Sequence, residues 1–229
     1  MIIAQFAGAV IIGYLLGSIP FGVLIGRRAG MDVRQYGSGK MGATNVLRTA
    51  GRKAAATVAC LDVLKGILAV VFAGLIVGKS YLVVGDFGLG MLVAQVLAAS
   101  AAIVGHIWPV FLKFRGGRGV ATFMGGLIAL CPPVALFSGE IMIIGAGLTK
   151  YASLSSIAGV VGAYAILVPL TIMHGFPIEY LAYALIGTII IIFVHRDNIT
   201  RLLAGTERKL GDKANMKDSP SPVVRESRV

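Results

Sequence analysis

Residues 119–149, GVATFMGGLIALCPPVALFSGEIMIIGAGLT, form a long apolar stretch that two adjacent prolines interrupt. As one helix the stretch would be a single membrane span and the chain would have six spans, whereas two helices would give seven. Proline has no N–H group to donate, and it disfavours helical geometry in the residue before it. The Cys131-Pro132-Pro133 sequence therefore favours two helices, over 119–130 and 134–149, of which the first is short for a membrane span.

The whole chain has the composition of a polytopic membrane protein. Of its 229 residues 57% are hydrophobic, and the mean hydropathy is +0.87, which is well above the range of soluble domains. A span needs roughly 20 apolar residues to cross the hydrocarbon core. The expected spans are 2–25, 54–78, 87–107, 119–130, 134–149, 153–173 and 178–194. No basic residue precedes the first run, which indicates a retained transmembrane helix and not a cleaved signal peptide.

The basic residues decide between six and seven spans. With seven spans, all of the 21 Lys and Arg residues except Lys65 and Lys79 lie in loops 26–53, 108–118 and 150–152 or in the chain from residue 195 onward. These four segments then share one side of the membrane, which the positive-inside rule makes cytoplasmic. The sequence thus predicts an all-α fold of seven transmembrane helices, with the N-terminus outside and the C-terminus in the cytoplasm. The fourth helix, roughly 18 Å long, is short or partly re-entrant.

The sequence predicts one membrane domain over residues 1–211, followed by a polar, disordered tail over 212–229. The formal charge is +11, and its concentration at one membrane face points to anionic lipids or an anionic substrate and not to nucleic acid. Cys60 and Cys131 lack ligand-like spacing, so we expect free thiols and no zinc site. No cluster of histidines and carboxylates indicates a metal site, and no cofactor is expected.

The loop YGSGKMGATNVLRTAGRK, residues 36–53, has the composition of a phosphate cradle. Its glycines permit positive φ angles that expose successive N–H groups, and its hydroxyl, amide and guanidinium groups are further donors. The candidate residues are Gly37, Ser38, Gly39, Lys40, Gly42, Thr44, Asn45 and Arg48. The alternative role of a basic loop is to rest on anionic lipid headgroups, and we assign that role to Arg27, Arg28, Arg52 and Lys53.

A second polar cluster lies in GHIWPVFLKFRGGRGVAT, residues 105–122. If Gly119 opens a helix, the Gly-Gly turn and the helix N-terminus form another anion-binding nest on the same face. The candidates are His106, Arg115, Gly116, Gly117, Arg118 and Gly119. The spacing is not that of a Walker A loop and no strand precedes it, so nucleotide hydrolysis is not expected. A histidine at a membrane edge is often structural, but two nearby arginines favour a functional role.

Two further segments present polar groups on the predicted cytoplasmic side. The stretch VHRDNITRLLAGTERKLG, residues 194–211, places His195 and Asn198 on one helical face and adds Glu207. The stretch YASLSS adds Ser153, Ser155 and Ser156, for which helix capping is the alternative role. Within the second span, Asp62 and Lys65 are three residues apart, a spacing that favours a buried structural ion pair.

These segments together resemble the bacterial acyl-phosphate:glycerol-3-phosphate acyltransferases, the PlsY family. The resemblance rests on GSIPFG, YGSGKMGATNVLR, LDVLKG, HIWPVFLKFRGGRGVAT and HRDNITRLLAGTERKLG, which follow one another along most of residues 10–211. It implies an enzyme of the bacterial cell membrane, active at the cytoplasmic face, that transfers a fatty acyl group from acyl phosphate to the 1-position of glycerol 3-phosphate. The products would be lysophosphatidic acid and phosphate, and an upstream enzyme would supply the acyl phosphate.

The resemblance also implies roles for individual residues. Ser38, Arg48 and the Arg115/Arg118 pair would hold the phosphates, His106, His195 and Asn198 would orient them, and Glu207 would lie near the polyol. Lys40 stands where the family pattern has asparagine. Because acyl phosphate is already activated, the expected mechanism uses proximity and oxyanion stabilisation without a protein nucleophile. The proton of the attacking hydroxyl would go to a histidine or to the leaving phosphate.

Two other function classes fit parts of the sequence. A transporter for a phosphorylated metabolite could use the basic loops to gather anions and Asp62 and Lys65 to line a path, but it would need polar residues on several spans. Here the polar residues gather on one face, which favours chemistry at the membrane surface. A purely lipid-binding scaffold would not need the clustered glycines.

Overall fold

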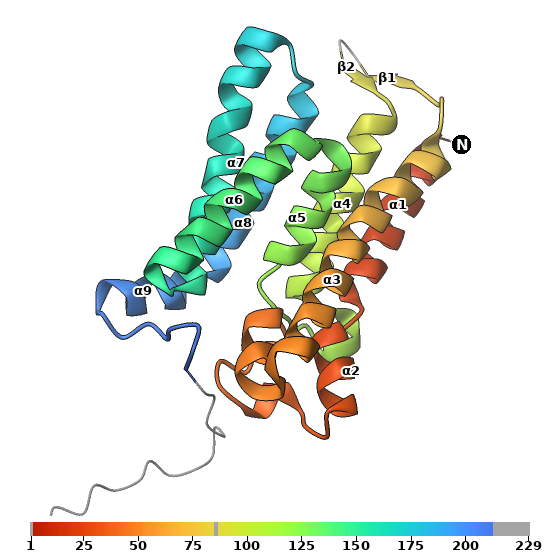
Figure 1. Ribbon diagram of the computed structural model, residues 1–229. Coiled ribbons are helices and arrows are strands. Elements are labelled where there is room, and N and C mark those ends of the chain that lie inside the picture. Colours follow the sequence, from red (N-terminus) through yellow and green to blue (C-terminus); the bar gives the residue numbers. More distant parts are fainter. Residues whose placement is uncertain (1, 85–86, 213–229) are drawn as a thin grey trace, which may run out of the picture.

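The computed structural model describes residues 2–84 and 87–212, and this part of the chain is mostly helical (Figure 1). The α-helices are α1 (Ile2–Ser18), α2 (Phe21–Arg28), α3 (Ala43–Val77), α4 (Met91–Ile107), α5 (Val120–Leu130), α6 (Pro132–Thr149), α7 (Ala152–His174), α8 (Ile178–Val194) and α9 (Arg196–Leu203). Short 3₁₀ turns form at Val33–Gln35 and Val110–Leu112, and two strands, β1 (Leu82–Val84) and β2 (Phe87–Leu89), pair antiparallel. The expected tail, 212–229, lies outside the described residues apart from Asp212.

Five stretches within the described residues are long and apolar enough to cross a membrane. They are Ile2–Arg28, Ala43–Val77, Met91–Leu112, Pro132–Thr149 and Ala152–His174, and a sixth is counted if α8 and α9, which bend by 61°, form one span. Helix α5 has only 11 residues. The structure thus supports a helical protein with several membrane spans.

The helix break at the paired prolines is present. Helix α5 ends at Leu130, Cys131 has the non-helical φ angle of −145°, and α6 begins at Pro132. Proline fits the first position of a helix because the N–H group it lacks would have no partner there. The stretch 119–149 therefore forms two helices that pack against each other.

Two details differ from the expected helices. The first span does not run unbroken over 2–25, because α1 ends at Ser18 and a new helix starts after Pro20, whose carbonyl accepts from Val23 and Leu24. The apolar run 87–107 is also not one helix, since residues 87–89 pair with 82–84 and α4 begins only at Met91. The fold is therefore not strictly all-α.

Glycines set the close spacing of the helices that carry the site. A Cβ atom on Gly17 of α1 would collide with the backbone of Ala102 in α4, and one on Gly66 of α3 would collide with Thr122 in α5. Small residues let helix backbones approach closely where no water drives association. Helices α1, α3, α4 and α5 consequently form one tight group, and α6, α7 and α8 lie beside it (Figure 1).

A central apolar core joins the two groups of helices. Phe123 of α5 stacks on Tyr183 of α8 with ring centroids 5.3 Å apart, and the Tyr183 hydroxyl donates to the Phe123 carbonyl at 2.9 Å. Ile103 and Leu127 are fully buried beside this pair. The core fixes the ends of α4, α5 and α8, where the polar residues lie.

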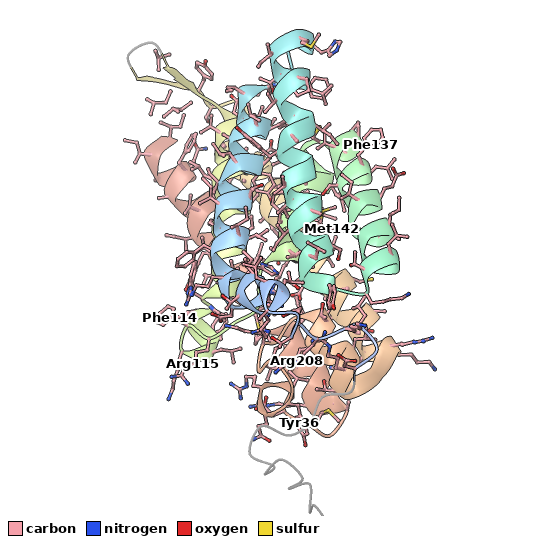
Figure 2. The ribbon with its side chains drawn as sticks, turned by 90° about the vertical axis from the view of Figure 1, so that its left-hand side faces the viewer. Tyr36, Phe114, Arg115, Phe137, Met142 and Arg208 are labelled. Atoms are coloured by element: carbon pink, nitrogen blue, oxygen red, sulfur yellow. The ribbon has the colours of Figure 1, made fainter. Side chains whose placement is uncertain are left out.

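The polar loops gather at one end of the molecule. Tyr36, Arg115 and Arg208, which come from three different loops, all lie at the lower end in Figure 2, together with α9. The hairpin of β1 and β2 and the α7–α8 connection lie at the opposite end (Figure 1). The clustering expected from the sequence, polar loops on one face, is therefore present in the fold.

Candidate active site

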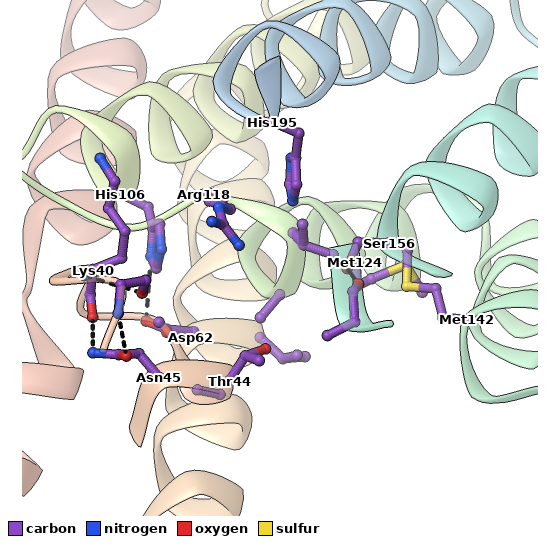
Figure 3. Close-up of a pocket in the computed structure, with 18 of the residues that line it drawn as sticks. Lys40, Thr44, Asn45, Asp62, His106, Arg118, Met124, Met142, Ser156 and His195 are labelled. Atoms are coloured by element: carbon purple, nitrogen blue, oxygen red, sulfur yellow. Dashed lines mark hydrogen bonds and ion pairs between the residues drawn. The ribbon is translucent and has the colours of Figure 1, made fainter. Parts of the chain in front are cut away.

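A cavity of about 270 Å³ opens among the polar loops (Figure 3). Eleven residues predicted from the sequence line it: Ser38, Lys40, Gly42, Thr44, Asn45, Arg48, His106, Arg118, Gly119, Ser156 and His195. Asp62 and a set of apolar residues complete the wall, namely Ala43, Val63, Val120, Ala121, Met124, Met142 and Ala152. Segments from all along the chain thus meet around one space with a polar end and an apolar side.

Three helices begin at this cavity. Residues 42–44 at the start of α3, residues 119–121 at the start of α5 and Ala152 at the start of α7 all line it. The first N–H groups of a helix have no partner within the helix and carry a partial positive charge. Gly119 adopts the left-handed φ angle of 80° directly before α5, as a glycine at that turn allows. The cavity is therefore favourable for anions even before any cationic side chain is considered.

Asn45 organises the glycine-rich loop. Its Nδ2 donates to the carbonyl oxygens of Val33 at 2.8 Å, Lys40 at 2.9 Å and Tyr36 at 3.2 Å, while its Oδ1 accepts from the Ser38 N–H at 3.0 Å. The loop turns through Gly37 and Gly39, which have the positive φ angles of 55° and 67°. Gly42 has a φ angle of −72° and opens α3 instead. The amide of Asn45 is thus occupied in shaping the loop around Ser38.

Arg48 and Arg118 bring unsatisfied donors to the cavity. The Nε atoms of both are buried and have no hydrogen-bond partner. Nη2 of Arg48 donates to the carbonyls of Arg208 and Lys209 at 3.0 and 3.1 Å, which fixes the guanidinium. Burial lowers the pKa of Arg118 to about 10, so it remains charged at neutral pH. Two buried cationic donors without partners leave room for an anionic ligand.

Arg115, predicted as the partner of Arg118, lies elsewhere. Its side chain is exposed and does not line the cavity. Arg118 points into the cavity between His106 and His195 (Figure 3). Only two residues, Gly116 and Gly117, separate the two arginines, yet Arg115 is exposed and Arg118 lines the cavity.

His106 lies against an intramembrane ion pair. Lys65 Nζ lies 2.8 Å from Asp62 Oδ1, as the spacing predicted, and His106 Nδ1 lies 3.5 Å from the same oxygen. Lys65 also donates to the carbonyl of Ile19, in the break between α1 and α2, at 3.2 Å. The pair therefore connects the break in the first span to a residue of the cavity.

Gly116 and Gly117 enclose His106. Their N–H groups donate to the carbonyls of Ile107 and His106, each at 3.0 Å, so these donors are already used. A Cβ atom on Gly116 would collide with the His106 carbonyl, and one on Gly117 would collide with the His106 ring at Nε2. Neither glycine lines the cavity. Gly116 and Gly117 pack against the histidine, whereas Gly119 is the glycine of this segment that lies at the cavity.

His195 follows α8 and presents one ring nitrogen to the cavity. Its Nδ1 lies 2.7 Å from the carbonyl oxygen of Ile191, and because a carbonyl can only accept, Nδ1 carries a proton. Burial, aided by the charge of Arg118, lowers the pKa of His195 to about 4. The ring is therefore neutral at pH 7, which leaves Nε2 with a free lone pair.

Glu207 is the centre of a second hydrogen-bond network. Its Oε1 accepts from Ser153 at 2.9 Å and from Asn198 at 2.6 Å, and its Oε2 accepts from Arg201 at 2.8 Å. Burial opposes its charge, but these hydrogen bonds outweigh burial and lower its pKa. Ser153, Asn198 and Glu207 do not line the cavity. They tie the segment after α9 to the start of α7.

The segment 206–212 links Arg48 to the connection between α6 and α7. Leu210 donates its N–H to the Lys150 carbonyl at 2.9 Å, and the carbonyls of Arg208 and Lys209 accept from Arg48. Ser155 and Ser156 donate to the Ala152 carbonyl, and the N-cap of α7 is Tyr151, so the serine hydroxyls do not cap the helix. Nothing in the sequence indicated this use of main-chain carbonyls, and nothing distinguished Met124 and Met142, which line the apolar side of the cavity.

The chain is similar to known acyltransferases along nearly its whole length. A model of the glycerol-3-phosphate acyltransferase family matches residues 7–205. It is 63% identical over 215 residues to glycerol-3-phosphate acyltransferase 3 of Dehalococcoides mccartyi, covering 93% of this chain and 100% of that protein. It is 44% identical over 208 residues to the glycerol-3-phosphate acyltransferase of Brucella anthropi, covering 90% of this chain and 94% of that protein.

Solved structures give the same result for the fold. The crystal structure of the integral membrane glycerol 3-phosphate acyltransferase PlsY in its glycerol 3-phosphate form superposes with a TM-score of 0.77 at 38% identity, covering 89% of this chain and 94% of that chain. Its lysophosphatidic acid form superposes with a TM-score of 0.76 at 37% identity, with the same coverage.

Proposed function

This chain belongs to the glycerol-3-phosphate acyltransferase family, and we propose that its acyl donor is a fatty acyl phosphate and that the reaction takes place in the cavity at the start of α3, α5 and α7. The acceptor is glycerol 3-phosphate and the lipid product is lysophosphatidic acid. With an acyl phosphate as donor, the second product is inorganic phosphate.

The observation that carries this proposal is the pair of buried Nε atoms without partners. Arg48 and Arg118 both line the cavity, and the buried Nε atom of each has no hydrogen-bond partner among the described residues. A buried charged donor without a protein partner is costly, so such groups in a cavity indicate that they bind a ligand. Together with three helix N-termini they suit two phosphate groups, one from each substrate.

The apolar side of the same cavity suits an acyl chain. Val63 of α3, Met124 of α5 and Met142 of α6 line it next to the polar end. Methionine side chains are flexible and adapt to chains of different shape. An acyl phosphate carries both features, a phosphate for the cationic end and a chain that lies between the helices.

The chemistry requires no protein nucleophile. The 1-hydroxyl oxygen of glycerol 3-phosphate attacks the acyl carbonyl carbon, the new ester C–O bond forms, and the bond from that carbon to the phosphate oxygen breaks. Arg48, Arg118 and the helix N-termini stabilise the negative charge on the acyl oxygen and on the leaving phosphate. Holding the two substrates side by side supplies much of the remaining acceleration.

The hydroxyl proton has two possible acceptors. One is the lone pair on His195 Nε2, and the other is an oxygen of the leaving phosphate. If His106→Ala and His195→Ala each retain near-normal turnover in the assay below, the phosphate is the acceptor. A large loss of kcat in His195→Ala alone identifies that histidine.

The proposed topology has seven crossings. The N-terminus lies outside, the C-terminus in the cytoplasm, and α5 is a short crossing of about 16 Å for its 11 residues. The site would then face the cytoplasm of a bacterial cell, where the basic loops lie according to the positive-inside rule. An enzyme that produces acyl phosphate would supply the donor at that face. A transporter would need polar residues along the spans, whereas here they concentrate at one end.

The donor is tested with purified protein in detergent. Glycerol 3-phosphate is supplied with palmitoyl phosphate or with palmitoyl-CoA, in buffer containing EDTA, and the lipid product is measured by mass spectrometry. Lysophosphatidic acid formed from palmitoyl phosphate and not from palmitoyl-CoA is the expected result. Product from palmitoyl-CoA alone would contradict the proposed donor. Complete loss of activity in EDTA would contradict a mechanism without a metal ion.

A further inference from the structure

A second cavity, of about 600 Å³, lies at the polar end of the molecule. Its walls come from residues 47–52 of α3, from the end of α6 and from residues 210–212, and these parts of the chain meet near the lower end in Figure 2. Among the described residues that line the reaction cavity, only Arg48 also lines this one. The reaction proposed above therefore leaves the second cavity without a role.

The polar part of this lining is mainly cationic. Arg48, Arg52 and Lys150 line the cavity, and Asp212 is the one carboxylate among the described lining residues. The Oδ2 atom of Asp212 already accepts the N–H of Lys209 at 2.7 Å. Arg52 and Lys150 are exposed, and their side chains form no hydrogen bond or ion pair with any described residue. The cavity thus offers an anion two cations that have no carboxylate partner in the described chain.

Hydrogen bonds between the walls keep the second cavity in shape. The Leu210 N–H donates to the Lys150 carbonyl at 2.9 Å, which ties the segment 206–212 to the end of α6. Nη2 of Arg48 donates to the carbonyls of Arg208 and Lys209, which ties the same segment to α3. Main-chain groups and Arg48 hold the three walls together, so the other two cationic side chains are not needed for that purpose.

The two cations without partners lie where a membrane span meets its polar flank. Lys150 directly follows the apolar stretch Pro132–Thr149, and Arg52 precedes the expected span 54–78 by two residues. Basic residues that flank a span lie at the level of the lipid headgroups. The cavity is therefore at the height at which lipid phosphates lie.

Helix α6 connects the cavity to the lipid-facing surface. Ile144 and Leu148 of this helix are 60% and 80% exposed, as is typical of side chains that face lipid chains. Gly147 lines the cavity, and a Cβ atom there would meet nothing within 4 Å. Leu47 and Leu210 add apolar surface on the other walls. The lining thus combines cations with apolar groups next to a surface that faces hydrocarbon.

From these observations we propose that the second cavity binds an anionic membrane phospholipid, whose phosphate group pairs with Arg52 and Lys150. Anionic headgroups attract basic residues at the membrane surface. The glycerol and the first acyl carbons of the lipid lie against Gly147 and Leu210, and the chains continue along α6. A soluble phosphate compound would leave the apolar lining unused, and a zwitterionic lipid would bring a positive charge to a cationic cavity. An anionic phospholipid matches both parts of the lining.

The cavity also separates basic residues that the sequence groups together. Arg28, Arg52 and Lys53 were all expected to rest on lipid headgroups, but only Arg52 lines the cavity, while Arg28 and Lys53 are exposed outside it. The double variant Arg28→Gln/Lys53→Gln removes one arginine and one lysine from the polar end. It is therefore the matched control for Arg52→Gln/Lys150→Gln.

Native mass spectrometry of the purified full-length protein in detergent micelles measures lipid binding. The protein is titrated with phosphatidylglycerol or with phosphatidylcholine of the same acyl chains, and the apparent melting temperature of each variant confirms that it is folded. We expect wild-type protein to bind phosphatidylglycerol at least about tenfold more tightly than phosphatidylcholine. Arg52→Gln/Lys150→Gln should weaken phosphatidylglycerol binding about 30-fold, while Arg28→Gln/Lys53→Gln changes it by less than about twofold.

Two further measurements separate a lipid in the cavity from other anions. Gly147→Leu fills the space without changing the charge and should weaken phosphatidylglycerol binding about tenfold. Equilibrium dialysis with radiolabelled inorganic phosphate should give the same binding for wild type and Arg52→Gln/Lys150→Gln.

The proposal is overturned if phosphatidylglycerol binds no better than phosphatidylcholine, or if the two double variants lose lipid binding equally. It is also overturned if Gly147→Leu leaves lipid binding unchanged, or if phosphate binding falls in Arg52→Gln/Lys150→Gln, which would assign the cavity to a free anion. None of these measurements needs an acyl donor, so their outcome is independent of the proposed reaction.

Discussion

Lys65 Nζ lies 2.8 Å from Asp62 Oδ1, and neither side chain is more than 2% exposed. Removing one member of a buried pair leaves the other charge uncompensated, which costs about 3–5 kcal/mol. We therefore predict that Lys65→Met markedly lowers the apparent melting temperature of the protein in detergent. Adding Asp62→Asn removes the orphaned charge and should recover much of the loss. If the double variant is no more stable than Lys65→Met alone, the pair does not hold the helices as described.

The contact between Gly117 and His106 gives a prediction about the histidine. A methyl group at Gly117 would collide with the His106 ring, so Gly117→Ala should displace the ring from the cavity and lower the rate of lysophosphatidic acid formation at least about tenfold. Gly8→Ala in α1 is the control, because a Cβ there meets nothing within 4 Å. Initial rates of the two purified variants provide the comparison. Wild-type turnover in Gly117→Ala would show that the position of His106 is unimportant.

Glu207 is predicted to act through the residues it holds. Glu207→Gln weakens the charge-assisted bonds from Asn198 and Arg201, each worth about 1.5–3 kcal/mol, and loosens the segment whose carbonyls fix Arg48. We expect a lower apparent melting temperature and a lower kcat/KM. Asp212→Asn, in the same segment but exposed, should change neither by much. Equal effects of the two substitutions would argue against a specific role for the Glu207 network.

The low pKa of His195 predicts a loss of stability in mild acid. The folded protein keeps this ring neutral down to about pH 4, whereas the unfolded chain takes up a proton below about pH 6.5. The unfolded state therefore binds more protons in this window, and stability falls as the pH decreases from about 6.5 to 4. His195→Gln should reduce the drop in apparent melting temperature between pH 7 and pH 5. An unchanged drop would show that His195 does not contribute to it.

Many residues that line the candidate site could be predicted from the sequence because such groups are unusual in a membrane protein. Glycines, hydroxyls and cations beside apolar runs stand out, and basic residues sort the loops to one face. Which of these residues face the cavity and which hold a loop in shape could not be predicted, because that depends on the folded geometry. Asn45 forms hydrogen bonds within its own loop and Arg115 turns outward, although both looked like phosphate ligands.

Other features had no signal in the sequence. Met124 and Met142 are apolar residues in apolar helices, so nothing distinguishes them from residues that face lipid. The carbonyls of Arg208 and Lys209 hold Arg48, and main-chain acceptors are the same in every residue. The helix break at the paired prolines was predictable. The break at Pro20 was missed because this proline lies inside a run long enough for one span, and membrane helices can tolerate a proline.

The contrast between Arg118 and Arg115 tests the central claim most directly, because the two cations are three residues apart and only Arg118 reaches the cavity. The measurement is kcat/KM for lysophosphatidic acid formation from palmitoyl phosphate and glycerol 3-phosphate. Losing a buried charged donor costs about 2–3 kcal/mol, so Arg118→Gln should lower kcat/KM by roughly 30- to 150-fold, while Arg115→Gln stays near the wild-type value. Equal losses in the two variants, or no loss in Arg118→Gln, would contradict the assignment of the cavity as the phosphate-binding active site.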